Sequence, residues 1–182
     1  STVDAIVPPN LTWADETPDA VADATPTVEF LVGYTTAAKN ANGGEAGVKA
    51  LINAAIASAN QAYQNSQAGV ALRLAASFEV AYTESGSLAT DLGRLANASD
   101  GHLDTLSAAR STYKADLISL IVTSGTDAAG IAYLWTSGAS AVSFANYAYS
   151  VVLDDYADAN LTLAHEVGHN LGCGHPNGDE GS

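Results

Sequence analysis

Hydrophobic side chains along this chain gather in short runs that have the character of β-strands. Residues 28–35 and 117–123 are almost continuously apolar and rich in β-branched side chains, which is typical of strands buried on both faces. Residues 70–82 begin with alternating apolar and polar positions, the pattern of a half-buried strand. Residues 130–135 and 148–153 are shorter apolar runs. These five segments are predicted to be strands.

The segments between these runs carry the helical period instead. Over residues 47–64 apolar side chains recur every three or four positions, which predicts a long helix with one buried stripe. Residues 88–97 and 103–113 are predicted to be two shorter helices. Because strands and helices alternate along the chain, the pattern indicates an α/β layered architecture.

The chain divides into two parts by composition. Residues 1–26 hold four of the five prolines and keep no period, so we predict a tail, a linker or the remnant of a propeptide. Residues 27–182 are predicted to form one domain. With 47% hydrophobic and 14% charged residues, the chain has the composition of a globular protein with a sizeable core.

A last helical segment is predicted shortly before the end of the chain. Leu163, Val167 and Leu171 fall at i, i+4 and i+8, so they form a buried stripe. Asp158 is expected to cap this helix. Histidines at positions 165 and 169 lie on another face, where they are expected to point into a cleft.

Candidate chemistry is concentrated in residues 165–175, which read H-E-x-x-H-x-x-G-x-x-H. His165 and His169 lie one helical turn apart, so their imidazoles can share a metal ion. Gly172 can adopt the left-handed conformation that ends a helix, and the chain can then return His175 as a third ligand. The five fixed positions arise by chance in roughly one in 10^5 chains of this length.

Three nitrogen ligands and one open position form the kind of site that holds a catalytic zinc ion, with water in the fourth position. Glu166 lies next to the first ligand and is expected to act as the base on that water. The sequence therefore predicts a zinc site of His165, His169 and His175 with Glu166 as the catalytic residue. A helix whose histidines bind nothing is the plainer alternative.

These eleven residues match the long zinc-binding signature of the metzincin clan, and the chain resembles its reprolysin-like (adamalysin-like) group from about residue 27 to residue 175. The resemblance implies a zinc endopeptidase whose α/β fold has long helices on a twisted, mixed, five-stranded sheet. This is the upper subdomain of the metzincin fold. It also implies that Ala132, Tyr133 and Leu134 form the antiparallel edge strand, which binds an extended protein or peptide substrate by strand addition.

Two features depart from that family pattern. Pro176 follows the third histidine, where reprolysin-like enzymes usually carry Asp. Only seven residues follow His175 and the chain has no methionine, so the lower subdomain and its methionine turn are expected to be largely missing or supplied by a separate C-terminal chain. An inactive, zinc-stabilised domain that binds peptides or assembles with a partner therefore stays open as an alternative function.

Charge and composition restrict the partners. With 20 acidic and 6 basic residues the formal charge is −14, so neither nucleic acid nor an anionic membrane surface is an expected partner. The absence of methionine even at position 1 predicts a start trimmed by processing, as in a secreted, extracellular protein. Cys173 is the only cysteine, so it is a redox-sensitive thiol near the metal, a partner in a disulfide to another chain, or a spare thiol that points away from the metal. An Asp of residues 1–26 that blocks the zinc in a latent form is a further alternative, which is not favoured because this segment has no cysteine and no recognisable switch motif.

Overall fold

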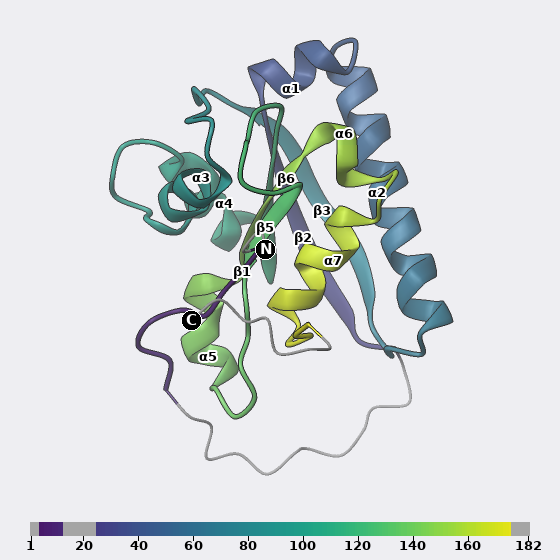
Figure 1. The fold of residues 1–182 in the computed structure, drawn as a ribbon, viewed down its shortest axis with the longest axis vertical. Helices are drawn as coiled ribbons and strands as arrows, with labels where there is room; N and C mark the ends of the chain where they lie inside the picture. The colour runs from purple at the N-terminus through teal and green to yellow at the C-terminus, as the bar shows by residue number, and fades with distance from the viewer. Residues whose placement is uncertain (1–3, 13–24, 176–182) are drawn as a thin grey trace.

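The computed structural model of the chain describes residues 4–12 and 25–175, in which a mixed β-sheet lies between two layers of helices (Figure 1). The strands are β1 (Ala5–Ile6), β2 (Thr27–Thr35), β3 (Ala71–Val80), β4 (Leu117–Val122), β5 (Gly130–Tyr133) and β6 (Tyr149–Leu153). The helices are α1 (Thr36–Ala41), α2 (Glu45–Asn65), α3 (Leu88–Ala96), α4 (Asp104–Tyr113), α5 (Ala141–Phe144), α6 (Asp154–Ala157) and α7 (Thr162–Asn170), with a 3-10 helix at Ala145–Tyr147. The α/β class predicted from the alternating pattern is confirmed.

The order of the strands across the sheet is β1-β5-β6-β4-β2-β3. Strands β3, β2, β4 and β6 are parallel to one another, whereas β5 is antiparallel to β6 and β1 is parallel to β5. All six residues of β4 are buried, which is the environment that its continuous apolar run predicts. The sheet is therefore mixed, with its reversed strands gathered at one side.

Within the described residues the sheet has six strands, one more than predicted. The additional strand β1 comes from the segment that was expected to be a tail, and it pairs Ala5 with Ala132 and Ile6 with Tyr133. Its pairing satisfies backbone groups that the outer edge of β5 would otherwise expose. A strand of two residues has no measurable period, so the hydrophobic pattern could not reveal it.

One face of the sheet is covered by α2 and α7, which lie side by side (Figure 1). The predicted stripe of α2 is buried there, from Val48 and Ile52 to Tyr63. The Tyr63 hydroxyl donates a 2.8 Å hydrogen bond to the carbonyl of Ala164 in α7. Because Leu163 of α7 is 1% exposed and packs into the same core, the two helices form one layer with the sheet.

The opposite face is covered by α3 and α4 (Figure 1). Leu88, Leu92 and Leu95 of α3 and Leu106 of α4 are all fully buried against this face. Helix α4 approaches β2 so closely that a Cβ on Gly33 would overlap a methyl group of Leu106. This close packing favours glycine where the helix crosses the strand.

The start of α7 differs from the expectation. Asp158 does not cap α7; it follows α6 and accepts a 2.6 Å hydrogen bond from the Ser58 hydroxyl of α2. The helix begins at Thr162 instead, after Leu161 in the left-handed conformation at φ 56°. The carboxylate that could have capped α7 is used to tie the preceding turn to α2.

Candidate metal centre

Helix α7 carries the first two histidines of the motif. Their rings lie one turn apart, as the spacing of four requires, and the Nε2 atoms of His165 and His169 are 3.0 Å apart. His169 is 2% exposed, whereas His165 faces the surface. The two imidazoles therefore meet at the boundary between the core and solvent.

The third histidine is delivered by a sharp turn at the end of α7. Gly172 has φ 93°, and its N–H donates to the carbonyl of His169 at 3.0 Å. The Cys173 N–H reaches back to the carbonyl of Gly168 at 2.9 Å, and the two bonds together form a Schellman motif. A Cβ at position 172 would also lie 3.3 Å from the Trp135 carbonyl oxygen, so the position suits glycine on two grounds.

After this turn the His175 ring faces that of His165, with 3.2 Å between their Nε2 atoms. Four ligands that surround zinc as a tetrahedron at about 2.0–2.1 Å are about 3.3 Å from one another. The nitrogen separations of 3.0 and 3.2 Å are close to that edge length. The donor set therefore fits a metal ion of this size.

The protonation of the second histidine also suits a metal ligand. The Nδ1–H of His169 donates a 2.7 Å hydrogen bond to the carbonyl of Cys173. This bond leaves the lone pair on Nε2, the atom that faces the other two rings. Burial lowers the pKa of His169, which favours the neutral imidazole that a metal ion binds.

Asp4 brings a fourth donor group to the same place. Its Oδ2 lies 3.3 Å from Nε2 of His165, and its Oδ1 lies 3.3 Å from Nε2 of His175. The ligand atoms of Asp4, His165, His169 and His175 all lie within 4.8 Å of one another. Sequence reasoning did not single out Asp4, because one Asp in an acidic segment without a period carries no distinguishing signal.

Glu166 is buried beside the histidines, at 1% exposure. Its Oε2 has no hydrogen-bond partner among the residues that the structure describes. Burial, followed by the charge of Asp4, raises the pKa of Glu166 well above its ordinary value. A buried carboxylate with an unused oxygen is suited to accept a proton from a molecule that enters the site.

The space for this carboxylate depends on Gly130 at the start of β5. A Cβ there would lie 2.6 Å from Oε1 and 2.7 Å from Cγ of Glu166. It would also lie 2.7 Å from Cγ2 of Thr162. Gly130 was predicted only as part of a strand, and its role follows from the packing of α7 on the sheet.

Asn170, the last residue of α7, fixes this end of the helix to the sheet. Its side-chain amide donates to the carbonyls of Tyr133 at 2.8 Å and Tyr149 at 3.1 Å. The Trp135 N–H donates to the His169 carbonyl at 2.9 Å. These bonds hold the second histidine in place, and the motif alone, in which position 170 is unspecified, did not point to them.

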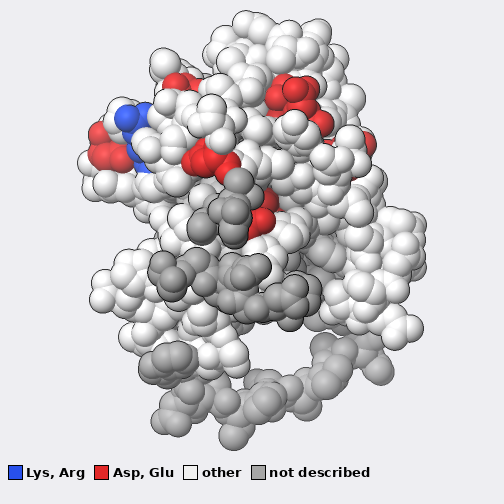
Figure 2. Space-filling model, in the orientation of Figure 1, with Lys and Arg blue, Asp and Glu red and all other residues white. Residues whose placement is uncertain are grey.

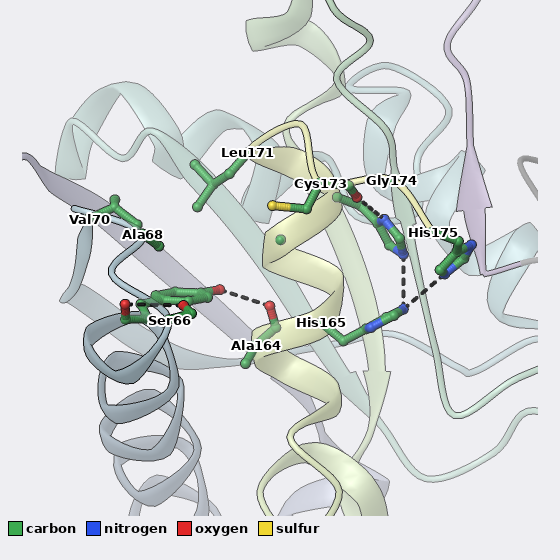
Figure 3. A pocket seen from close by; sticks show the side chains of 12 residues that line it. Ser66, Ala68, Val70, Ala164, His165, Leu171, Cys173, Gly174 and His175 are labelled. Atoms are coloured by element: carbon green, nitrogen blue, oxygen red, sulfur yellow. Dashed lines mark hydrogen bonds between the residues drawn. The ribbon is translucent and has the colours of Figure 1, made fainter. Parts of the chain in front are cut away.

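A pocket of about 510 Å³ lies between the histidines and the end of α2 (Figure 3). His165 and His175 stand at one side of it, and Ser66, Ala68 and Val70 stand at the other. Cys173, a free and exposed cysteine, also lines this pocket. The pocket has the size and the apolar lining of a site for a side chain or small ligand.

The edge strand expected to bind substrate is not at the edge. Ala132 N–H donates to the Asp4 carbonyl at 2.9 Å, and Leu134 N–H donates to the Ile6 carbonyl at 2.8 Å. Ala132 and Leu134 are buried and Tyr133 is partly buried. The prediction of a free edge at residues 132–134 is therefore wrong for this structure, because β1 occupies the backbone groups that would pair with a peptide.

Acidic side chains gather at several places on the face shown in Figure 2, whereas Lys and Arg side chains are visible only at one margin of that face. This view agrees with the formal charge of −14. Within the described ranges, no helix combines the length and apolar character that crossing a bilayer requires. Pro176 lies outside the described residues.

A helix with two histidines one turn apart, a third histidine after a glycine turn and a buried glutamate define a domain of the metallopeptidase class. Residues 24–182 match the reprolysin-like metallo-peptidase family M12B. The chain belongs to this family, so the resemblance to reprolysin-like enzymes is confirmed.

Curated relatives match this sequence over most of its length. The peptidyl-Asp metalloendopeptidase of Stenotrophomonas maltophilia (strain R551-3) is 38% identical over 143 residues, which are 79% of this chain and 32% of that protein. The protein of the same name from strain K279a is 36% identical over 165 residues, 88% of this chain and 37% of that protein. The one from Xanthomonas campestris pv. campestris is 37% identical over 143 residues, again 79% and 32%. The chain thus spans about a third of the length of these relatives.

A solved structure supports the fold. A chain in the "Structure of a chaperone-substrate complex" superposes with a TM-score of 0.68 at 21% identity, over 86% of this chain and 28% of that chain. At this identity the match concerns the arrangement of the strands and helices alone.

Proposed function

We propose that this chain is the catalytic part of a secreted, zinc-dependent endopeptidase that hydrolyses peptide bonds in protein substrates. The observation that carries the proposal is the convergence of the Nε2 atoms of His165, His169 and His175 beside the buried carboxylate of Glu166, whose Oε2 has no hydrogen-bond partner among the described residues. Imidazole nitrogens at these separations suit zinc. The name of the curated relatives supports the same reaction class.

His165, His169 and His175 would hold zinc, which would supply the Lewis acid that polarises the scissile carbonyl and makes water more acidic. Glu166 accepts a proton from the attacking water, as the carbon–oxygen bond forms. It then gives this proton to the nitrogen of the leaving amine, as the carbon–nitrogen bond breaks. Its burial favours this role, because burial raises the pKa of Glu166 and so makes it a stronger base.

The substrate is proposed to lie along β5 and to place one side chain in the pocket beside the histidines. Backbone groups of Ala132, Tyr133 and Leu134 would bind an extended peptide once their outer edge is clear. The relatives are named for peptidyl-Asp bonds, so we propose aspartyl peptides as the substrate class. The turn at Gly172 positions the third ligand next to that pocket.

The test compares the wild-type protein with Glu166→Gln and with the control Glu45→Gln, a change at an exposed residue of α2. Glu166→Gln should keep one zinc ion per chain, measured by atomic emission, while kcat on a fluorogenic Asp-containing peptide falls by about 10²–10⁴. Glu45→Gln should leave both values unchanged. A chelator should abolish cleavage, and the Asp peptide should be cleaved faster than its Asn counterpart.

Equal rates for Glu166→Gln and the wild type would show that another group acts as the base. One zinc ion per chain without turnover in any form would instead support the inactive binding or assembly domain. A protein that takes up no zinc, even when metal is supplied in excess, would exclude the metal-dependent mechanism.

A further inference from the structure

The outer edge of β5 is occupied by a segment of the same chain. Ala5 and Ile6 pair in register with Ala132 and Tyr133, and carbonyls at positions 4 and 6 accept the N–H groups at positions 132 and 134. Ala5 is 3% exposed. An extended peptide could not add to this edge while these bonds are made.

The same segment also closes the metal centre. Oδ2 of Asp4 lies 3.3 Å from Nε2 of His165 and Oδ1 lies 3.3 Å from Nε2 of His175, which matches the edge length of a zinc tetrahedron, about 3.3 Å. The carboxylate of Asp4 thus lies beside the metal centre, where one of its oxygens could serve as the fourth ligand. Three histidines and one carboxylate make a closed set, the form that structural zinc sites have and catalytic sites avoid.

The charges around the site favour a cation between these groups. Asp4 places a carboxylate beside the imidazoles of His165 and His175. A divalent ion held between these imidazoles and the carboxylate would be attracted by the negative charge of Asp4.

We propose that residues 4–6 are a latency segment, in which Asp4 is the fourth protein ligand of the metal while β1 covers the strand that substrate needs. The inference rests on the proposed function and adds the regulation of that site. Removal of the segment from β5 opens the fourth ligand position and the sheet edge in one movement. Water could then take the ligand position that the carboxylate leaves, so that one metal–oxygen bond would replace another and no bond within the chain would break.

The first test asks whether Asp4 is a ligand and does not depend on activity. Asp4→Asn and Asp4→Ala are compared with the wild type and with the control Asp155→Asn, an exposed Asp of α6. Cobalt(II) replaces zinc, and the visible absorption bands of the metal report its ligands. Both Asp4 variants should shift these bands and weaken metal affinity by about tenfold or more, since even neighbours of metal ligands contribute about 10–100-fold.

The second test asks whether the segment competes with substrate. A short peptide hydroxamate is titrated calorimetrically into each zinc-loaded protein, because the hydroxamate needs both a free ligand position and a free strand edge. Asp4→Ala should bind it at least about tenfold more tightly than the wild type, a difference of about 1.4 kcal/mol. The same variant should cleave the Asp peptide faster than the wild type, whereas Asp155→Asn should match the wild type in both assays.

The outcomes separate the two proposals. Cobalt spectra and metal affinities that are the same in the wild type and both Asp4 variants would overturn the assignment of Asp4 as a ligand. Equal hydroxamate affinities would overturn latency. Absence of hydrolysis in every form, with the spectral and affinity changes still present, would refute the proposed peptidase but leave the closure of the metal site by Asp4 established.

Discussion

Replacement of Gly130 by alanine tests whether the position of the Glu166 carboxylate depends on the missing side chain of β5. The new Cβ would lie 2.6 Å from Oε1 and 2.7 Å from Cγ of Glu166, and 2.7 Å from Cγ2 of Thr162. Carbon atoms in contact prefer about 3.5–4.0 Å. The glutamate must therefore move by about 1 Å to relieve these contacts.

The size of the effect follows from this displacement. Overpacking of a filled core costs about 1–3 kcal/mol of the free energy of unfolding. Misplacement of a catalytic group by about 1 Å lowers the rate about 10²-fold, which corresponds to about 2.7 kcal/mol of transition-state free energy. Metal affinity should stay unchanged, because the close contacts of the new Cβ are with Glu166 and Thr162 and not with a histidine.

The assay measures kcat/KM on the Asp peptide, zinc content, and stability by urea unfolding. The control is Gly93→Ala in α3, where a Cβ would meet nothing within 4 Å. Because Gly93 is exposed in a helix, alanine should stabilise the fold there by about 1 kcal/mol and leave activity unchanged. Wild-type activity and stability in Gly130→Ala would refute the claim that this glycine makes room for the carboxylate.

Two further predictions concern stability. Burial would raise the pKa of Glu84, but hydrogen bonds from Thr35, Ser124 and Thr123 outweigh it and lower that pKa. Glu84→Gln should therefore cost about 1–2 kcal/mol in urea unfolding at pH 7. The loss should shrink as the pH falls below about 4.3, because there the unfolded chain binds a proton at Glu84 before the folded chain does. A loss that does not depend on pH would contradict this account. Lys114 ends α4 in the left-handed conformation at φ 51°, which glycine adopts with less strain. Lys114→Gly should therefore raise the free energy of unfolding by about 0.5 kcal/mol in the same assay. A decrease would show that the side chain of Lys114 contributes more than its backbone strain costs.

The main strands and helices could be predicted because each is long enough to show its period. The buried run at β4 and the stripe from Val48 to Tyr63 in α2 depend only on which side chains face the core. The short elements could not be predicted in this way. Helix α5 has four residues and β1 has two, so neither completes enough turns or alternations to be recognised.

The candidate site was predictable as far as its chemistry depends on spacing within one segment. Residues 165–175 determine their own geometry, because a helical turn and a glycine C-cap suffice to bring three imidazoles together. Gly130 and Asn170 act through contacts between α7 and β5, which lie far apart in sequence. Such contacts depend on how helix and sheet pack, and a local pattern does not contain them.

Asp4 shows why the groups that cover a site can be harder to predict from sequence than the residues that perform its chemistry. Its carboxylate is one of 20 acidic groups, and only the position of β1 distinguishes it from the others. That position in turn depends on the unpaired outer edge that the reversal of β5 leaves at the side of the sheet. Ala5 and Ile6 pair with β5, and the preceding residue Asp4 lies beside the histidines. Because these residues are consecutive, each of the two contacts favours the other. A substrate that adds to β5 must therefore displace both, which couples access to the strand with access to the metal.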